Sequence, residues 1–263
     1  MLKKITASIV LSCALAAPSV LAQAFKSTVI TALRPLKVAK FVEVTPGRDY
    51  DLEGYGLMFG LHVGSDEGSF TYRAIKGDFD VSVRMESVHN DDKAFTEAGL
   101  MARKSRHPSD LMVGQSVTTN QYEGDADQYT FMRRTRFGGF LYDAAPKDLP
   151  GGGGLGNADF SYQARGYQKD NSGKAGGKTR PFPHVWLRLK REGDTYTGWC
   201  KEGVDGEWKQ VGTTTVDLGE EPLVGIFISA NHHSVSSTWG NPTSRAFVQF
   251  RDLTGFPVSA AQP

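Results

Sequence analysis

The sequence predicts an all-β protein whose strands form a sandwich of two antiparallel sheets. Short runs rich in β-branched and aromatic residues recur along the chain, and turn residues separate them, as in Lys76-Gly77-Asp78. No stretch of convincing length has the spacing of an amphipathic helix. Many short strands without intervening helices are typical of a sandwich or jelly roll, so we expect an antiparallel jelly-roll sandwich.

Ten runs have the composition of strands. They are residues 36–44, 70–75, 79–88, 98–102, 111–118, 129–134, 185–191, 196–200, 223–230 and 246–253. Asp205-Gly206 lies between two apolar runs, and this dipeptide is a strong hairpin signal.

Alternation along these runs assigns residues to the two faces of each strand. In residues 185–191, Val185, Leu187 and Leu189 share one face, whereas Trp186 and Arg188 share the other with Lys190. The aromatic and basic face is therefore a candidate binding surface, and the aliphatic face belongs to the core.

The N-terminal residues 1–24 have the pattern of a secretory signal peptide. Lys3 and Lys4 precede an apolar run, Pro18 ends it, and small-residue cleavage patterns follow at 20–24. We expect export to the periplasm or the medium, and one mature domain at 25–263. A buried N-terminal helix and lipidation at Cys13 are the alternatives. The apolar run is too short for a comfortable membrane span, and no later segment approaches the needed length.

The charge and the cysteine content of the sequence argue against several classes of function. Once Lys3 and Lys4 are removed, 28 basic and 29 acidic residues remain, so nothing supports a nucleic-acid partner or a polybasic membrane segment. Cys200 is then the single cysteine, which excludes an intramolecular disulfide and a cysteine-based zinc site. We interpret Cys200 as a small buried hydrophobe.

Residues 143–183 depart from the strand pattern. Four consecutive glycines begin at Gly151, and a second glycine-rich stretch spans 171–178. Such a stretch loses too much conformational entropy on ordering to form a regular element, so we expect a long insertion between two strands. The glycine run lacks the Gly-Lys-Ser or Gly-Lys-Thr ending of a phosphate loop.

Six motifs follow one another along the chain: GDFDVSVR at 77–84, EAGLMAR at 97–103, WLRLKREGDTY at 186–196, GEWKQVG at 206–212, PLVGIFISA at 222–230 and AFVQFRDL at 246–253. In this order they resemble the motifs of the concanavalin A-like lectin/glucanase superfamily, whose domains are laminin G-like jelly rolls. The resemblance covers about 51–253 without the insertion, and it is to the stand-alone type of domain, of unknown function, that is found in exported bacterial proteins. Glu97 stands where the family pattern has lysine. The resemblance implies a jelly roll of roughly a dozen strands and a lectin-like carbohydrate-binding role.

A glycosidase needs two carboxylates flanking the scissile bond. The Glu-x-Asp-x-x-Glu strand of some catalytic members of the superfamily is absent, so no catalytic residue is assigned. A pair from separate strands, such as Glu97 with Asp127, stays open, and with it a glycoside hydrolase or lyase. No serine-hydrolase elbow of the Gly-x-Ser-x-Gly type occurs either.

A binding module instead needs exposed aromatic rings with a few polar groups. Alternation and position favour a set of side chains on strands and loops as ligand contacts. They are Trp186, Arg188, Arg103, Glu97, Tyr129 and Arg133 on strands, and Trp239 and Tyr122 in loops. We expect Trp186, Arg188 and Arg103 to line one groove.

No cofactor is expected, with calcium as an open alternative. Asp125 and Asp127 could offer oxygens to calcium, as could residues 90–92, but no loop supplies the six or more that calcium prefers. His232 and His233 are adjacent, so on a strand they would point to opposite faces.

The leading hypothesis is therefore an exported, non-catalytic protein that binds carbohydrate or a cell-envelope component. Besides the hydrolase or lyase, a structural or protein-binding module stays open, with Phe160, Tyr162 or Tyr167 of the insertion as an apolar contact.

Overall fold

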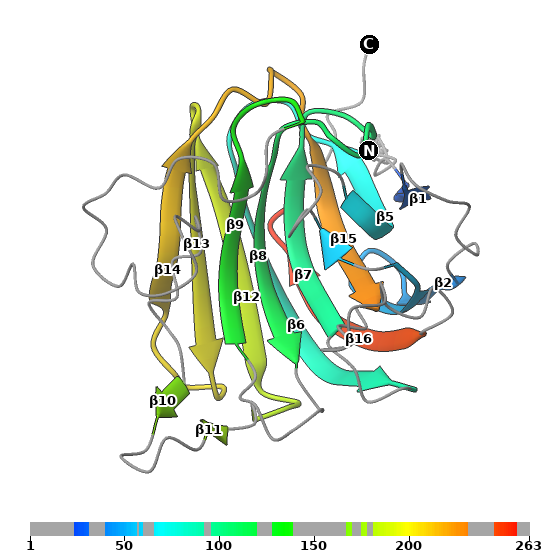
Figure 1. Cartoon of the computed structure of the whole chain (residues 1–263), viewed down its shortest axis with the longest axis vertical. Coiled ribbons are helices and arrows are strands. Elements are labelled where there is room, and N and C mark those ends of the chain that lie inside the picture. Colours follow the sequence, from blue (N-terminus) through cyan, green and yellow to red (C-terminus); the bar gives the residue numbers. More distant parts are fainter. Residues whose placement is uncertain are drawn as a thin grey trace, which may run out of the picture.

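The computed structural model describes residues 24–31, 40–56, 58–59, 66–91, 96–119, 128–138, 167–169, 175–177, 181–230 and 245–256. These residues form two large antiparallel sheets that pack face to face, and β7, β8 and β9 overlie β6, β12 and β13 in Figure 1. Among the described elements there is no helix long and apolar enough to cross a membrane.

Sheet 1 holds six strands in one path. Their order is β1 (Lys26–Ile30), β5 (Asp66–Ala74), β15 (Leu223–Ala230), β7 (Thr96–Arg103), β8 (Met112–Thr119) and β9 (Gln128–Arg134), and the short β4 (Met58–Phe59) pairs with β5.

Sheet 2 holds seven strands. Their order is β14 (Lys209–Thr215), β13 (Thr195–Glu202), β12 (Val185–Glu192), β6 (Phe79–Asn90), β16 (Ala246–Thr254), β3 (Asp49–Gly54) and β2 (Lys40–Thr45). Neighbours such as β6 and β16 are far apart in the sequence, as in a jelly roll, and the predicted two-sheet antiparallel sandwich is confirmed.

The predicted strands correspond to β2, β5 to β9, β12, β13, β15 and β16. In the two large sheets the prediction missed β1, β3, β14 and the short β4. In β3 the sequence is DYDLEG, whose acids and glycine are unfavourable in strands, yet Tyr50 and Leu52 point into the core and the acids point outward. Burial of one face therefore outweighs the low strand propensity of the other.

The expectation that the insertion has no regular element was wrong for two short segments. β10 (Tyr167–Lys169) and β11 (Ala175–Gly177) pair antiparallel, which requires only backbone hydrogen bonds. The rest of residues 143–180 lies outside the described part of the chain.

The core lies between the two sheets and follows the predicted alternation. Val81 and Val83 of β6 pair with Leu189 and Leu187 of β12, and all four side chains are fully buried. From sheet 1 the Phe131 ring packs on paired glycines: a Cβ atom would come within 2.6 Å of that ring at Gly198 and 2.4 Å at Gly212. Both positions require glycine because of this close approach.

Sheet 1 is buried on its outer face as well. The strands of sheet 1 place a second apolar cluster on that face, and its buried members are Ile30, Phe70, Tyr72, Met101, Met112, Met132 and Phe227. All eight residues of β7 are buried, whereas β12 alternates between buried and half-buried side chains. Sheet 2 therefore presents the accessible large sheet face of the described structure.

Candidate functional site

The predicted binding residues do not form one groove. Trp186 and Arg188 lie on the outer face of sheet 2, but Arg103 and Glu97 lie on the outer face of sheet 1, and Tyr129 packs in the core between the sheets. The two outer faces are on opposite sides of the sandwich, so the expected groove of Trp186, Arg188 and Arg103 was wrong. Alternation assigns a face within a strand but does not tell which sheet the strand joins.

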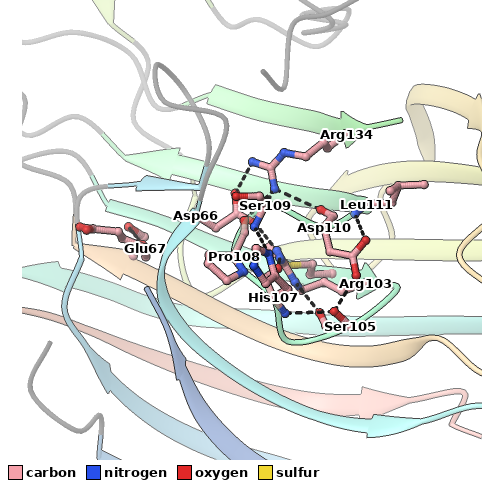
Figure 2. Close-up of polar contacts among 12 residues, drawn as sticks. Asp66, Glu67, Arg103, Ser105, His107, Pro108, Ser109, Asp110, Leu111 and Arg134 are labelled. Atoms are coloured by element: carbon pink, nitrogen blue, oxygen red, sulfur yellow. Dashed lines mark hydrogen bonds and ion pairs between the residues drawn. The ribbon is translucent and has the colours of Figure 1, made fainter. Parts of the chain in front are cut away.

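Arg103 is fully buried in an ion cluster (Figure 2). Its guanidinium and that of Arg134 both contact the carboxylate of Asp66, and none of the three side chains is exposed. Arg103 also donates from Nη2 to the His107 carbonyl at 2.7 Å and from Nε to the Ser105 carbonyl at 3.2 Å. These hydrogen bonds fix the chain after β7, and because the side chain is fully buried it does not reach a ligand in solvent.

The other predicted residues of sheet 1 are also turned away from solvent. Glu97 is buried and accepts a hydrogen bond from Ser116 Oγ at 3.1 Å. The buried Tyr129 hydroxyl donates to Glu202 at 3.1 Å, and Arg133 Nη1 donates to Thr214 Oγ1 at 3.4 Å, across the two sheets. These contacts join β9 to β13 and β14.

Other predicted groups cannot be placed. Trp239, Tyr122, Asp125 and Asp127, together with residues 92, 160, 162, 232 and 233, lie outside the described residues, as does the side chain of Tyr167. Within the described ranges, no group of three or more His, Cys, Asp or Glu side chains could hold a metal ion.

The outer face of sheet 2 carries a row of alternating cations and indoles, which we call the tryptophan ladder. Its members are Arg84, Trp186, Lys201, Trp208, Arg188 and Trp199, in that spatial order. Successive separations from the charged group to the ring centroid are 5.9, 4.8, 5.4, 5.8 and 4.9 Å. Each separation is within the range of a cation–π contact.

Strand register builds the ladder. Lys201, Trp186 and Arg84 stand side by side on β13, β12 and β6, and Trp199 stands beside Arg188 one row away. Trp208, in the connection just before β14, lies between Lys201 and Arg188 and so links the two rows. The three indole side chains belong to half-buried residues, so part of each remains accessible.

Carboxylates neutralise the two arginines of the ladder. Arg188 donates to both oxygens of Asp80, at 2.6 and 2.5 Å, and this hydrogen bonding lowers the pKa of Asp80 and raises the pKa of Arg188. Arg84 Nε donates to Asp252 at 2.8 Å. Burial alone would raise the pKa of Asp252, but hydrogen bonds from Arg84 and Arg48 outweigh it, and the pKa lies below its ordinary value.

Lys201 differs from the two arginines. Its ammonium donates to the backbone carbonyl of Val204 at 3.0 Å and contacts the indoles of Trp186 and Trp208. Its charge is thus balanced by dipoles and ring quadrupoles rather than by a carboxylate within the described residues.

Sequence reasoning identified Trp186 and Arg188 but missed Trp199, Lys201, Arg84 and Trp208 as members of this site. Alternation in 195–202 would have placed Trp199 and Lys201 opposite the core residues Tyr196 and Cys200. No strand pattern could place Trp208, because it lies in the connection between β13 and β14.

Comparison with models of known protein families gives no match, and comparison with curated proteins also gives none. Solved structures do match. A functionally unknown protein from Saccharomyces cerevisiae is 14% identical, with a TM-score of 0.51 over 89% of this chain and 97% of that chain. A legume lectin-like domain from Entamoeba histolytica is 12% identical, with a TM-score of 0.41 over 96% of this chain and 100% of that one.

A xylan β-1,4-xylosidase from Bacillus halodurans also matches, at 16% identity and a TM-score of 0.42, over 77% of this chain and 32% of that chain. At such identities a likeness concerns the fold alone. The sheet order shows a two-sheet antiparallel jelly-roll sandwich, which is the fold that the ordered sequence motifs predict.

Proposed function

We propose that this chain is an exported, non-catalytic binding protein that holds a carbohydrate or another cell-envelope component against the tryptophan ladder. The observation that carries the proposal is the row of three accessible indoles alternating with three cations on sheet 2. Flat aromatic rings suit the apolar faces of sugar rings, and a few polar groups beside them fix orientation. The N-terminal pattern of residues 1–24 supports export.

Trp199 is the indole best suited to stack on a sugar. Trp186 and Trp208 each contact two cations, whereas Trp199, at the end of the ladder, contacts one among the described residues. A ring with one cation neighbour has more of its surface left for a ligand. We therefore place the principal stacking contact at Trp199.

Charge favours a glycan with acidic groups. Asp252 and Asp80 already pair with Arg84 and Arg188, but the acceptor of Lys201 is a neutral carbonyl. A carboxylate or sulfate on the ligand would meet Lys201 without first breaking an ion pair. The neighbouring contacts also hold these side chains in place, which lowers the entropy cost of binding.

The test is a polysaccharide and glycan-array binding screen with the mature protein, run with calcium and with chelator and assayed for released sugar. We expect binding without release of reducing ends. Trp199→Ala should weaken binding roughly tenfold. Lys201→Met should weaken binding to acidic glycans more than to neutral ones.

Phe247→Ala is the matched control. Phe247 is a half-buried aromatic residue on the outer side of β16, in the same sheet face but outside the ladder. Equal loss in Trp199→Ala and Phe247→Ala would contradict the ladder as the site. Release of reducing ends would contradict the non-catalytic assignment, and the absence of any glycan ligand would contradict carbohydrate as the ligand of the tryptophan ladder.

A further inference from the structure

Two loops meet at one end of sheet 1, and we call them the basic loop pair. One spans residues 104–111 between β7 and β8, and the other spans residues 135–138 after β9. The Gly138 amide donates to the Ser109 carbonyl at 2.8 Å, and the rings of His107 and Phe137 lie 4.9 Å apart between centroids. The two loops therefore form one surface.

The buried ion cluster holds this surface rigid from beneath (Figure 2). Arg134 Nη1 donates to the carbonyls of Pro108 and Asp110, at 2.9 and 3.1 Å, and Arg103 donates to those of Ser105 and His107. Four carbonyls of a single loop thus bind two buried guanidinium groups. The loop conformation is fixed before any partner arrives.

The surface is apolar at its centre and basic around it. The side chain of Phe137 is 64% exposed, which is more than any other large hydrophobic residue among those described. Lys104, Arg106 and Arg136 are also exposed. The single acid of the two loops, Asp110, is occupied by hydrogen bonds from Ser105 Oγ at 2.6 Å and from the Leu111 amide at 2.8 Å.

We propose that the basic loop pair docks the protein on the surface of an anionic phospholipid bilayer. Cations near such a surface are attracted by its negative potential, and an exposed aromatic ring gains by entering the interface. A soluble polyanion would satisfy the cations but would leave Phe137 in water, so the pairing of ring and charge favours lipid. The near-neutral net charge of the sequence does not predict this basic patch, because the fold brings together cations that are about thirty residues apart in the sequence.

The site is independent of the tryptophan ladder, which lies on the outer face of the other sheet. Membrane docking and glycan binding can therefore be lost separately. A protein with both would hold a glycan next to a membrane surface.

The test is co-sedimentation of the mature protein with vesicles of phosphatidylglycerol and phosphatidylcholine, compared with phosphatidylcholine alone. We expect binding to the anionic vesicles that weakens as salt is added. Phe137→Ala should weaken it about tenfold, and Lys104→Ala and Arg106→Ala should each weaken it about fivefold.

Matched controls exist in residues 204–209, in and just after the connection between β13 and β14. Val204 is 63% exposed and Lys209 is exposed, and neither belongs to the basic loop pair. Val204→Ala and Lys209→Ala should bind vesicles as the wild type does. The proposal is overturned if the wild type binds neither kind of vesicle or binds both equally. It is also overturned if the control variants lose as much vesicle binding as the variants of the basic loop pair. A third contradicting result is that Phe137→Ala binds normally and soluble polyglutamate competes fully.

Discussion

Asp66 accepts hydrogen bonds from Arg134 at both carboxylate oxygens, at 2.9 and 2.6 Å, and neither side chain is exposed. Arg103 contacts the same carboxylate, so one buried anion serves two buried cations. Removing the anion would leave two guanidinium groups uncompensated in an apolar surrounding, which is the costly way to break a buried pair.

We predict that Asp66→Asn lowers the free energy of unfolding by about 3–5 kcal/mol. Urea denaturation followed by circular dichroism measures it. Asp80→Asn is the control, because the side chain of Asp80 is 42% exposed while making a comparable two-oxygen pair with Arg188. Its cost should stay within about 1 kcal/mol, and equal losses in the two variants would contradict the role of burial.

Asp252 makes stability dependent on acid pH. Its pKa is lowered in the folded protein because hydrogen bonds from Arg84 and Arg48 outweigh burial. A lowered folded pKa contributes stability that is complete above the ordinary carboxyl range, near pH 4, and is lost as pH falls through the folded value.

Asp252→Asn should therefore flatten the fall in stability below about pH 4. Asparagine suits the position because Asp252 has a φ of 55°, in the left-handed region that asparagine tolerates. Urea midpoints between pH 2 and 7 test this, and an unchanged acid slope would contradict it.

Tyr196 makes stability dependent on alkaline pH in the opposite sense. Burial raises the pKa of this phenol to about 12. The raised value contributes stability that is complete below the ordinary phenol value, near 10, and is lost as pH rises through the folded value.

Tyr196→Phe should reduce the loss of stability above about pH 10. At neutral pH the variant should be as stable as the wild type or slightly more so, since the buried hydroxyl finds no hydrogen-bond partner among the described residues. Thermal unfolding at pH 7 and pH 11 distinguishes the two effects. A large loss at pH 7 would reveal a partner for the hydroxyl.

Gln115 is a buried amide within the sandwich. It pairs in register with Leu100 and Phe131, both core residues, and neither Oε1 nor Nε2 has a partner in the described part of the chain. Gln115→Met keeps a similar length and removes both polar atoms. We expect the free energy of unfolding to rise by roughly 1–2 kcal/mol, whereas a clear loss in urea denaturation would show that the amide makes a stabilising contact.

The aliphatic core positions of the central strands were predictable from the sequence. Alternation at Val81, Val83, Leu187 and Leu189 identifies core positions, because a strand with one buried face repeats every two residues. The same rule placed Trp186 and Arg188 on the opposite face, where the ladder lies. Strand propensity failed for β3, whose acids face outward beside a buried Tyr50 and Leu52.

The sequence by itself determined an all-β chain of paired strands and the accessible side of β12. Only the tertiary structure decided that the outer face of sheet 1 is buried, which turns Arg103 and Glu97 into internal residues. It also placed Trp208 between Lys201 and Arg188, and Phe137 beside His107. The physical reason is that alternation depends on neighbours within one strand, whereas burial of a sheet face and the meeting of two loops depend on contacts between segments far apart in the chain.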